Sequence, residues 1–185
     1  MEMLTLKEAA ERLGVMRYNI MYLMETGAIT ASKVEPFEGQ FWHEKTEVLF
    51  TAEALEEARA EFERRKFLHV FEQFGYVVEP DAKFAFGPGW EQILRNALTK
   101  LTAIPGPPKV TGGKEKFGAM VLHIDHDWTH KDEIKAIRDA YKLFSTETCE
   151  ECGRPGHLRK GPHLWKTTCE KHAHLVGELP DSGQF

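Results

Sequence analysis

The chain has 185 residues, of which 42% are hydrophobic and 29% charged, so it is too apolar to be disordered. Its length suits one domain or two small ones, and its formal net charge of −5 argues against non-specific coating of nucleic acid, which requires clustered Lys and Arg. No run approaches the roughly 20 apolar residues of a membrane span, and the acidic N-terminus is unlike a signal peptide, so we expect a cytoplasmic protein without a membrane partner.

The first predicted element is a short helix that begins after Thr5. Thr5 and Glu8 have the spacing of a capping box, and Gly14 can supply the positive φ that ends the helix. One face of this helix is apolar and comprises Leu6, Ala9, Ala10 and Leu13. A tight turn and a second helix over Arg17–Glu25 follow, which together predict a helix-turn-helix. The inward side chains of the second helix are Ile20, Leu23 and Met24.

Residues 29–34 and 40–48 alternate in polarity, which predicts a β-hairpin around Pro36 and Gly39. Over residues 3–58 the chain resembles the winged helix-turn-helix of the MerR and excisionase type, with its Ala-Ala pair and its Leu-Gly-Val turn. The resemblance implies that the second helix enters the major groove of DNA. The side chains on its outward face would be Arg17, Tyr18, Asn19 and Tyr22.

The charge of this segment leaves an alternative open. Residues 1–66 contain nine Lys and Arg against thirteen Glu, a balance of −4. An acidic surface is repelled by phosphate, so the same fold could instead dock on a protein. We therefore predict a DNA-binding regulator or accessory protein of phage or mobile-element type. The alternative is an inhibitor or adaptor that docks on a host protein through an acidic winged-helix module.

Residues 67–88 are predicted to connect the two halves of the chain. An aromatic stripe of Phe67, Val70, Phe71 and Phe74 continues a helical pattern in a shifted phase after Arg64. The stripe either packs against the second half or, as in MerR-like proteins, forms a contact in a homodimer.

The second half is predicted to have α+β structure over residues 89–176. A helix over residues 90–101 ends before the Pro-Gly-Pro-Pro run at 105–108, a strand covers 116–125, and a helix capped by Thr129 covers 131–144. The expected inward residues of the last helix are Ile134, Ile137, Tyr141 and Phe144. Residues 177–185 are expected to form a flexible tail.

The strand and the turn after it carry His123, Asp125, His126, Asp127 and His130. Histidine and carboxylate ligands at close spacing can hold a catalytic metal, but Asp and His are also common turn and capping residues. In zinc-dependent HNH nucleases the catalytic histidine lies between two Cys pairs, whereas this cluster precedes the cysteines. We therefore expect no enzyme.

The strongest motif holds all three cysteines of the chain. Cys149 and Cys152 form a CxxC pair followed by Gly153, and sixteen residues later Cys169 and His172 form a CxxH pair. Two such pairs suit tetrahedral Zn²⁺, and a hairpin between them predicts a treble-clef-like module. Because the protein fills all four positions, we expect one structural zinc per chain. His157, His163 and His174 are alternatives to His172 as the fourth ligand.

Residues 89–173 also resemble an uncharacterised C-terminal domain of bacterial and bacteriophage proteins. The shared features are a Gly-Trp helix start, a Lys-Glu-Lys-Phe-Gly strand at 114–118, and the terminal Cys and His motif. This resemblance implies a fold and no known activity. The overall expectation is an α+β protein, with a winged helix-turn-helix over 1–66 and an α/β zinc-binding domain over 89–176.

Overall fold

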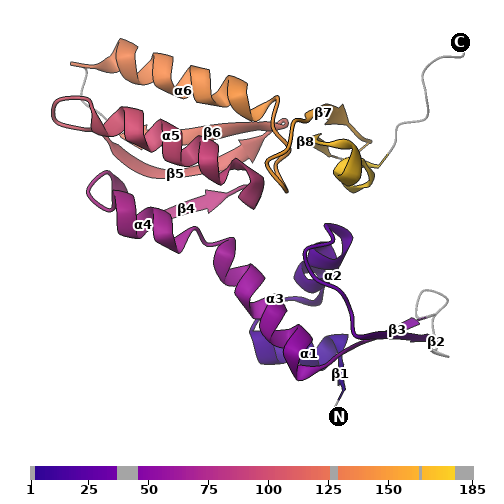
Figure 1. The fold of residues 1–185 in the computed structure, drawn as a ribbon. Coiled ribbons are helices and arrows are strands. Elements are labelled where there is room, and N and C mark those ends of the chain that lie inside the picture. Colours follow the sequence, from indigo (N-terminus) through magenta and orange to yellow (C-terminus); the bar gives the residue numbers. More distant parts are fainter. Residues whose placement is uncertain (1–2, 37–45, 126–128, 163, 178–185) are drawn as a thin grey trace, which may run out of the picture. The chain divides into compact units, whose positions relative to one another are not determined.

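The computed structural model describes residues 3–36, 46–125, 129–162 and 164–177 and contains both helices and sheets, which confirms the α+β class (Figure 1). The contacts divide the chain into two units, Met1–Arg64 and Arg65–Phe185, and each unit has its own hydrophobic core. Among the described residues, every helix is too short or too polar to cross a bilayer.

The first unit begins with strand β1 (Leu4–Thr5) and helix α1 (Leu6–Leu13). The predicted capping box is present, because the Thr5 backbone N–H donates to Glu8 at 2.8 Å and the Thr5 hydroxyl accepts from the Glu8 N–H at 3.3 Å. Gly14 ends the helix with φ of 68°. Helix α2 (Arg17–Glu25) follows with the predicted bounds, and Ile20 and Leu23 are its buried residues.

A three-stranded antiparallel sheet and helix α3 (Ala52–Arg64) complete the first unit. Strands β2 (Lys33–Pro36) and β3 (Thr46–Phe50) pair with Val34 opposite Val48, and β1 pairs with the other edge of β3. The first strand starts at Lys33 and not at the expected Ile29, because Ile29 is buried in the helical core and its N–H bonds to Leu23. Residues 40–45 of the second predicted strand lie outside the described residues.

In place of the connecting segment expected over 67–88, the structure has core elements of the second unit. Helix α4 (Leu68–Phe74) begins after its N-cap Phe67, which has φ of 55°, and strand β4 (Val78–Ala85) comes next. Phe67, Val70 and Phe74 are all buried in the second core. The aromatic stripe therefore packs within the second unit, because burying these rings removes a large apolar area from water.

The sheet of the second unit has the order β4-β5-β6. The short 3-10 helix η1 (Pro88–Trp90) and helix α5 (Glu91–Thr102) connect β4 to β5 (Lys109–Lys116), which is parallel to β4. The predicted single strand over 116–125 is wrong at its start. Phe117 and Gly118 have φ of 54° and 75°, so the chain reverses there, and β6 (Ala119–Asp125) pairs back on β5.

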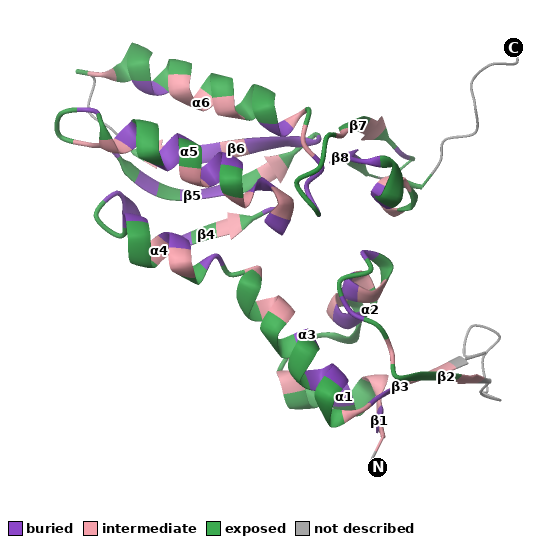
Figure 2. Ribbon diagram, viewed as in Figure 1, coloured by how far each residue is buried: buried purple, intermediate pink, exposed green. Residues whose placement is uncertain are grey.

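Helix α6 (Lys131–Ser145) packs against α5 and β6, with Ile134 buried (Figures 1 and 2). Its N-cap is His130 and not the expected Thr129, because the backbone becomes helical one residue later. Phe144, expected to face inward, is 51% exposed, since it lies near the end of the helix and contacts Tyr141 instead of the core.

The second unit ends with a two-stranded antiparallel sheet and a 3-10 helix. Strands β7 (His157–Lys160) and β8 (Trp165–Thr168) form the predicted hairpin, and η2 (Glu170–Val176) follows. The predicted flexible tail lies, apart from Gly177, outside the described residues.

Candidate metal centre

The four predicted metal ligands come together in the second unit. The ligand atoms of Cys149, Cys152, Cys169 and His172 all lie within 4.8 Å of one another. Cys149 Sγ is 3.4 Å and Cys169 Sγ is 3.5 Å from His172 Nδ1, and the Cys152 and Cys169 sulfurs are 3.6 Å apart. Among the described residues this is the one group of Cys, His and acidic side chains with the spacing of a metal site.

These distances fit a tetrahedral ion. With metal–sulfur bonds of about 2.3 Å and a metal–nitrogen bond of about 2.0 Å, neighbouring ligand atoms of a tetrahedron lie roughly 3.5–3.8 Å apart. Three of the six separations between ligand atoms, at 3.4, 3.5 and 3.6 Å, lie within about 0.2 Å of that spacing. His172 would bind through Nδ1, which requires the tautomer with its proton on Nε2.

The local backbone of the CxxC pair explains why the two sulfurs point the same way. The Gly153 N–H donates to the Cys149 carbonyl at 2.9 Å, and Gly153 has φ of 72°, which an L side chain rarely adopts. Cys169 is the N-cap of η2, and the His172 N–H donates to its carbonyl at 3.1 Å. Each pair therefore sits in a tight turn that presents both of its ligands on one side.

The CxxC turn is held against η1, which leads into α5. The Gly89 N–H donates to the Glu150 carbonyl at 2.7 Å, and the Trp90 indole N–H donates to the Thr148 carbonyl at 2.7 Å. A Cβ atom at residue 89 would overlap the Cys149 carbonyl oxygen and would lie 2.7 Å from the Cys152 nitrogen. The Gly-Trp pair of the sequence is thus a docking site for the metal-binding turn.

A buried set of charges lies beside the ligands. Glu150 and Glu151, the two residues between the cysteines, are both buried, and their carboxylates lie 2.7 and 2.8 Å from the ammonium group of buried Lys166. Arg65 pairs with Glu151 at 3.0 Å. Burial raises the pKa of Glu150 above its ordinary value, although the Lys166 charge opposes this shift. Because β8 carries Lys166, this pairing ties the hairpin to the CxxC turn.

The thiols need to lose protons before they can bind a metal. Burial and the neighbouring thiols raise the pKa of Cys152 to about 11. Burial also acts to raise the pKa of Cys169, but hydrogen bonds from the His172 backbone and from the other thiols outweigh it, and the net pKa is lowered. At neutral pH a metal must therefore displace protons from the cluster, which makes its affinity depend on pH.

On a four-coordinate ion these four side chains would fill every ligand position. Of the other histidines considered as ligands, His157 and His174 are exposed and do not belong to the cluster, and His163 lies outside the described residues. Sequence reasoning missed Gly89, Glu150, Glu151 and Lys166 as supports of the site. The two adjacent glutamates between Cys149 and Cys152 were the available signal. Only their burial distinguishes them from the residues of a solvated loop.

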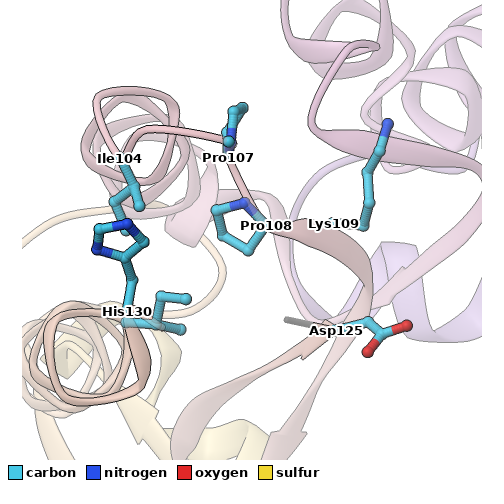
Figure 3. A pocket seen from close by; sticks show the side chains of 8 residues that line it. Ile104, Pro107, Pro108, Lys109, Asp125 and His130 are labelled. Atoms are coloured by element: carbon cyan, nitrogen blue, oxygen red, sulfur yellow. The ribbon is translucent and has the colours of Figure 1, made fainter. Parts of the chain in front are cut away.

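The histidine and aspartate cluster between β6 and α6 does not form a metal group among the described residues. His123 and Asp125 are exposed, His126 and Asp127 lie outside the described residues, and His130 lies 3.5 Å from Glu133 on its own helix. Asp125 and His130 do line a small hollow of about 230 Å³ with Ile104, Pro107 and Pro108 (Figure 3). In this view the Asp125 carboxylate points away from the His130 ring.

The predicted DNA-contacting residues all belong to α2 but differ in exposure. Arg17 is exposed and Tyr18 is 60% exposed, whereas Tyr22 and Asn19 are half-buried. The Asn19 side-chain oxygen accepts from the Met16 N–H at 3.1 Å at the start of the helix. The Asn19 amide oxygen therefore has a partner within the protein and supports the start of α2.

Comparisons with known protein families, with curated proteins and with solved structures found no match to this chain.

Proposed function

We propose that the chain is a non-catalytic, DNA-binding regulator or accessory protein of phage or mobile-element type, with one structural Zn²⁺. The observation that carries the proposal is the exposure of Arg17 and Tyr18 on the first turn of α2, directly after the turn that follows α1. The hairpin β2–β3 supports an assignment of Met1–Arg64 as a winged helix-turn-helix. In that arrangement Arg17 reads a base edge and Tyr18 contacts phosphate.

The Cys3His cluster supports zinc as the metal, because three thiolates and one imidazole in a tetrahedron are the preferred set of that ion. The ion would fasten the β7–β8 hairpin and η2 to the start of α5. Its role is therefore architectural within the second unit.

The test of DNA binding is salt-dependent association of the whole protein with duplex DNA, including its own promoter region. Arg17→Ala should weaken specific binding by about 1–3 kcal/mol, and affinity should fall steeply as salt rises. Lys7→Ala, on the exposed face of α1, is a matched control that removes a cation away from α2. Absence of salt-sensitive binding to any DNA would refute the regulator proposal.

A second candidate is a protein-binding inhibitor or adaptor. The surface around Arg17 favours it, because Met16, Tyr18 and Met21 are 64, 60 and 48% exposed and residues 1–66 carry a net charge of −4. Exposed methionines adapt well to protein surfaces. A pull-down from cells with and without nuclease treatment separates the two candidates, because a host protein retained after nuclease treatment supports the adaptor.

A further inference from the structure

The second unit carries an exposed aromatic patch that the metal centre does not explain. We define this patch as Phe117, Trp165, Lys116 and Lys160. Phe117 is 65% exposed and Trp165 is 40% exposed, and their ring centroids lie 5.6 Å apart. The rings border a hollow of about 400 Å³ that is also lined by Glu115, Pro162 and Leu164.

The backbone holds the Phe117 ring in solvent. Phe117 has φ of 54°, a conformation that costs energy for a bulky residue, and it occupies the tip of the β5–β6 turn. Gly118 next to it is locked against the β7–β8 hairpin, since the Thr167 hydroxyl donates to its carbonyl at 2.6 Å. The turn is therefore fixed by its neighbours, and the exposed ring contributes little burial in return. Such a strained, exposed aromatic residue is better explained by binding than by folding.

Two lysines lie against the rings, although the whole chain is acidic, and the carboxylate of Glu115 in the same turn accepts from the Gly118 N–H at 2.6 Å. The Lys160 ammonium lies 4.5 Å from the centre of the Trp165 ring, and the Lys116 ammonium lies 5.6 Å from that of Phe117. Among the described residues, neither lysine takes part in a salt bridge with an acidic side chain. The sequence of the β7–β8 hairpin, residues 157–168, contains no Asp or Glu.

From this combination we propose that the patch binds single-stranded nucleic acid. Unpaired bases stack on exposed aromatic rings, and flexible lysines beside the rings neutralise the phosphates that link the bases. Double-stranded DNA keeps its bases paired and stacked, so it cannot use the ring faces. The ligand is thus different from the duplex assigned to α2, and the proposal does not depend on that assignment.

Fluorescence anisotropy of the zinc-loaded protein with a labelled oligothymidylate of about 20 nucleotides tests the proposal. Affinity should fall by about tenfold between about 50 and 200 mM salt, as expected for two or three phosphate contacts. Phe117→Ala and Trp165→Ala should each weaken binding at least roughly fivefold. Tyr76→Ala is the matched control, because Tyr76 is an aromatic residue of the same unit that is 58% exposed but lies outside the patch, and it should bind as the wild type does.

Zinc content and circular dichroism identify any variant that fails to fold. If a ring variant fails to fold, the double variant Lys116→Glu, Lys160→Glu takes its place. It leaves both rings intact and should reduce both the affinity for the oligonucleotide and the salt dependence of that affinity. The proposal is overturned if the wild type does not bind the oligonucleotide, if the folded ring variants bind equally well, or if Tyr76→Ala is as damaging. It is also overturned if the wild type retains a cellular protein after nuclease treatment and the ring variants lose that protein while they still bind the oligonucleotide. A duplex of the same length, tested with Arg17→Ala, reports on α2 separately.

Discussion

The backbone of Gly89 lies directly against the carbonyl oxygen of Cys149, so that a side chain at residue 89 would overlap this oxygen. The contact joins η1, which leads into α5, to the first of the four candidate metal ligands, and the Gly89 N–H donates to the Glu150 carbonyl in the same turn. The metal centre is therefore not a detached appendage of the second unit. Its geometry depends on a residue sixty positions earlier in the sequence.

The first prediction concerns this contact. Gly89→Ala should lower zinc affinity on the order of 10–100-fold without removing a ligand, because backbone atoms of Cys149 and Cys152 must move to accept the methyl group. Competition with a chelator that changes colour on binding zinc measures the effect. Gly106→Ala is the control, since residue 106 has φ of 62° but no atom within 4 Å of an added Cβ. Equal affinities of the two variants would show that the contact does not position the ligands.

The second prediction concerns the metal itself. Protein purified without chelators should contain one zinc per chain, and Cys152→Ser or Cys169→Ser should release it. Structural zinc contributes on the order of 10 kcal/mol to small modules, so the segment from about Cys149 onward should unfold while Met1–Arg64 keeps its own core. Elemental analysis and hydrogen exchange measure both effects. The control is His157→Ala, which changes an exposed histidine outside the cluster and should retain the metal. Wild-type protein that contains no zinc would contradict the prediction.

The third prediction concerns the buried ion pairs. Lys166→Met should destabilise the second unit by about 3–5 kcal/mol, because Glu150 and Glu151 would keep two buried carboxylates without their shared ammonium group. Urea unfolding of the zinc-loaded protein measures the loss. Lys171→Met removes an exposed lysine close to the same ligands and should change the stability by less than about 0.5 kcal/mol. If both variants unfold at the same urea concentration, the ion pairs have no net stabilising role.

The fourth prediction concerns the capping box. Thr5→Ala should cost about 1 kcal/mol and lower the melting temperature of the first unit by about 4–8 °C. Hydrogen bonds to Thr5 lower the pKa of Glu8 below its ordinary value of 4.5. The stability that Glu8 adds is therefore complete above about pH 4.5 and is lost as the pH falls through its lowered pKa. Calorimetry from neutral to acid pH should show this loss in the wild type, and Glu8→Gln should remove it.

Local patterns in the sequence were enough to predict the first two helices, helix α5 and the group of three cysteines and a histidine that could hold a metal ion. Each depends on residues close in the chain, such as Thr5 with Glu8, or on the chemistry of a few residues, such as three cysteines and a histidine in two pairs. Their physical causes are hydrogen bonds within one helical turn and the ligand preference of a metal ion, which act wherever the chain goes.

Only the tertiary structure decided the role of residues 67–88, the reversal at Phe117 and the environment of the CxxC turn. Phe67 and Phe74 could have faced solvent, a partner subunit or a core, because periodicity does not specify what covers an apolar face. The charges of Glu150 and Glu151 suggest a solvated loop until Lys166, sixteen and fifteen residues further along the chain, is brought against them. Burial and ion pairing arise between distant segments, and local sequence does not encode which segments meet.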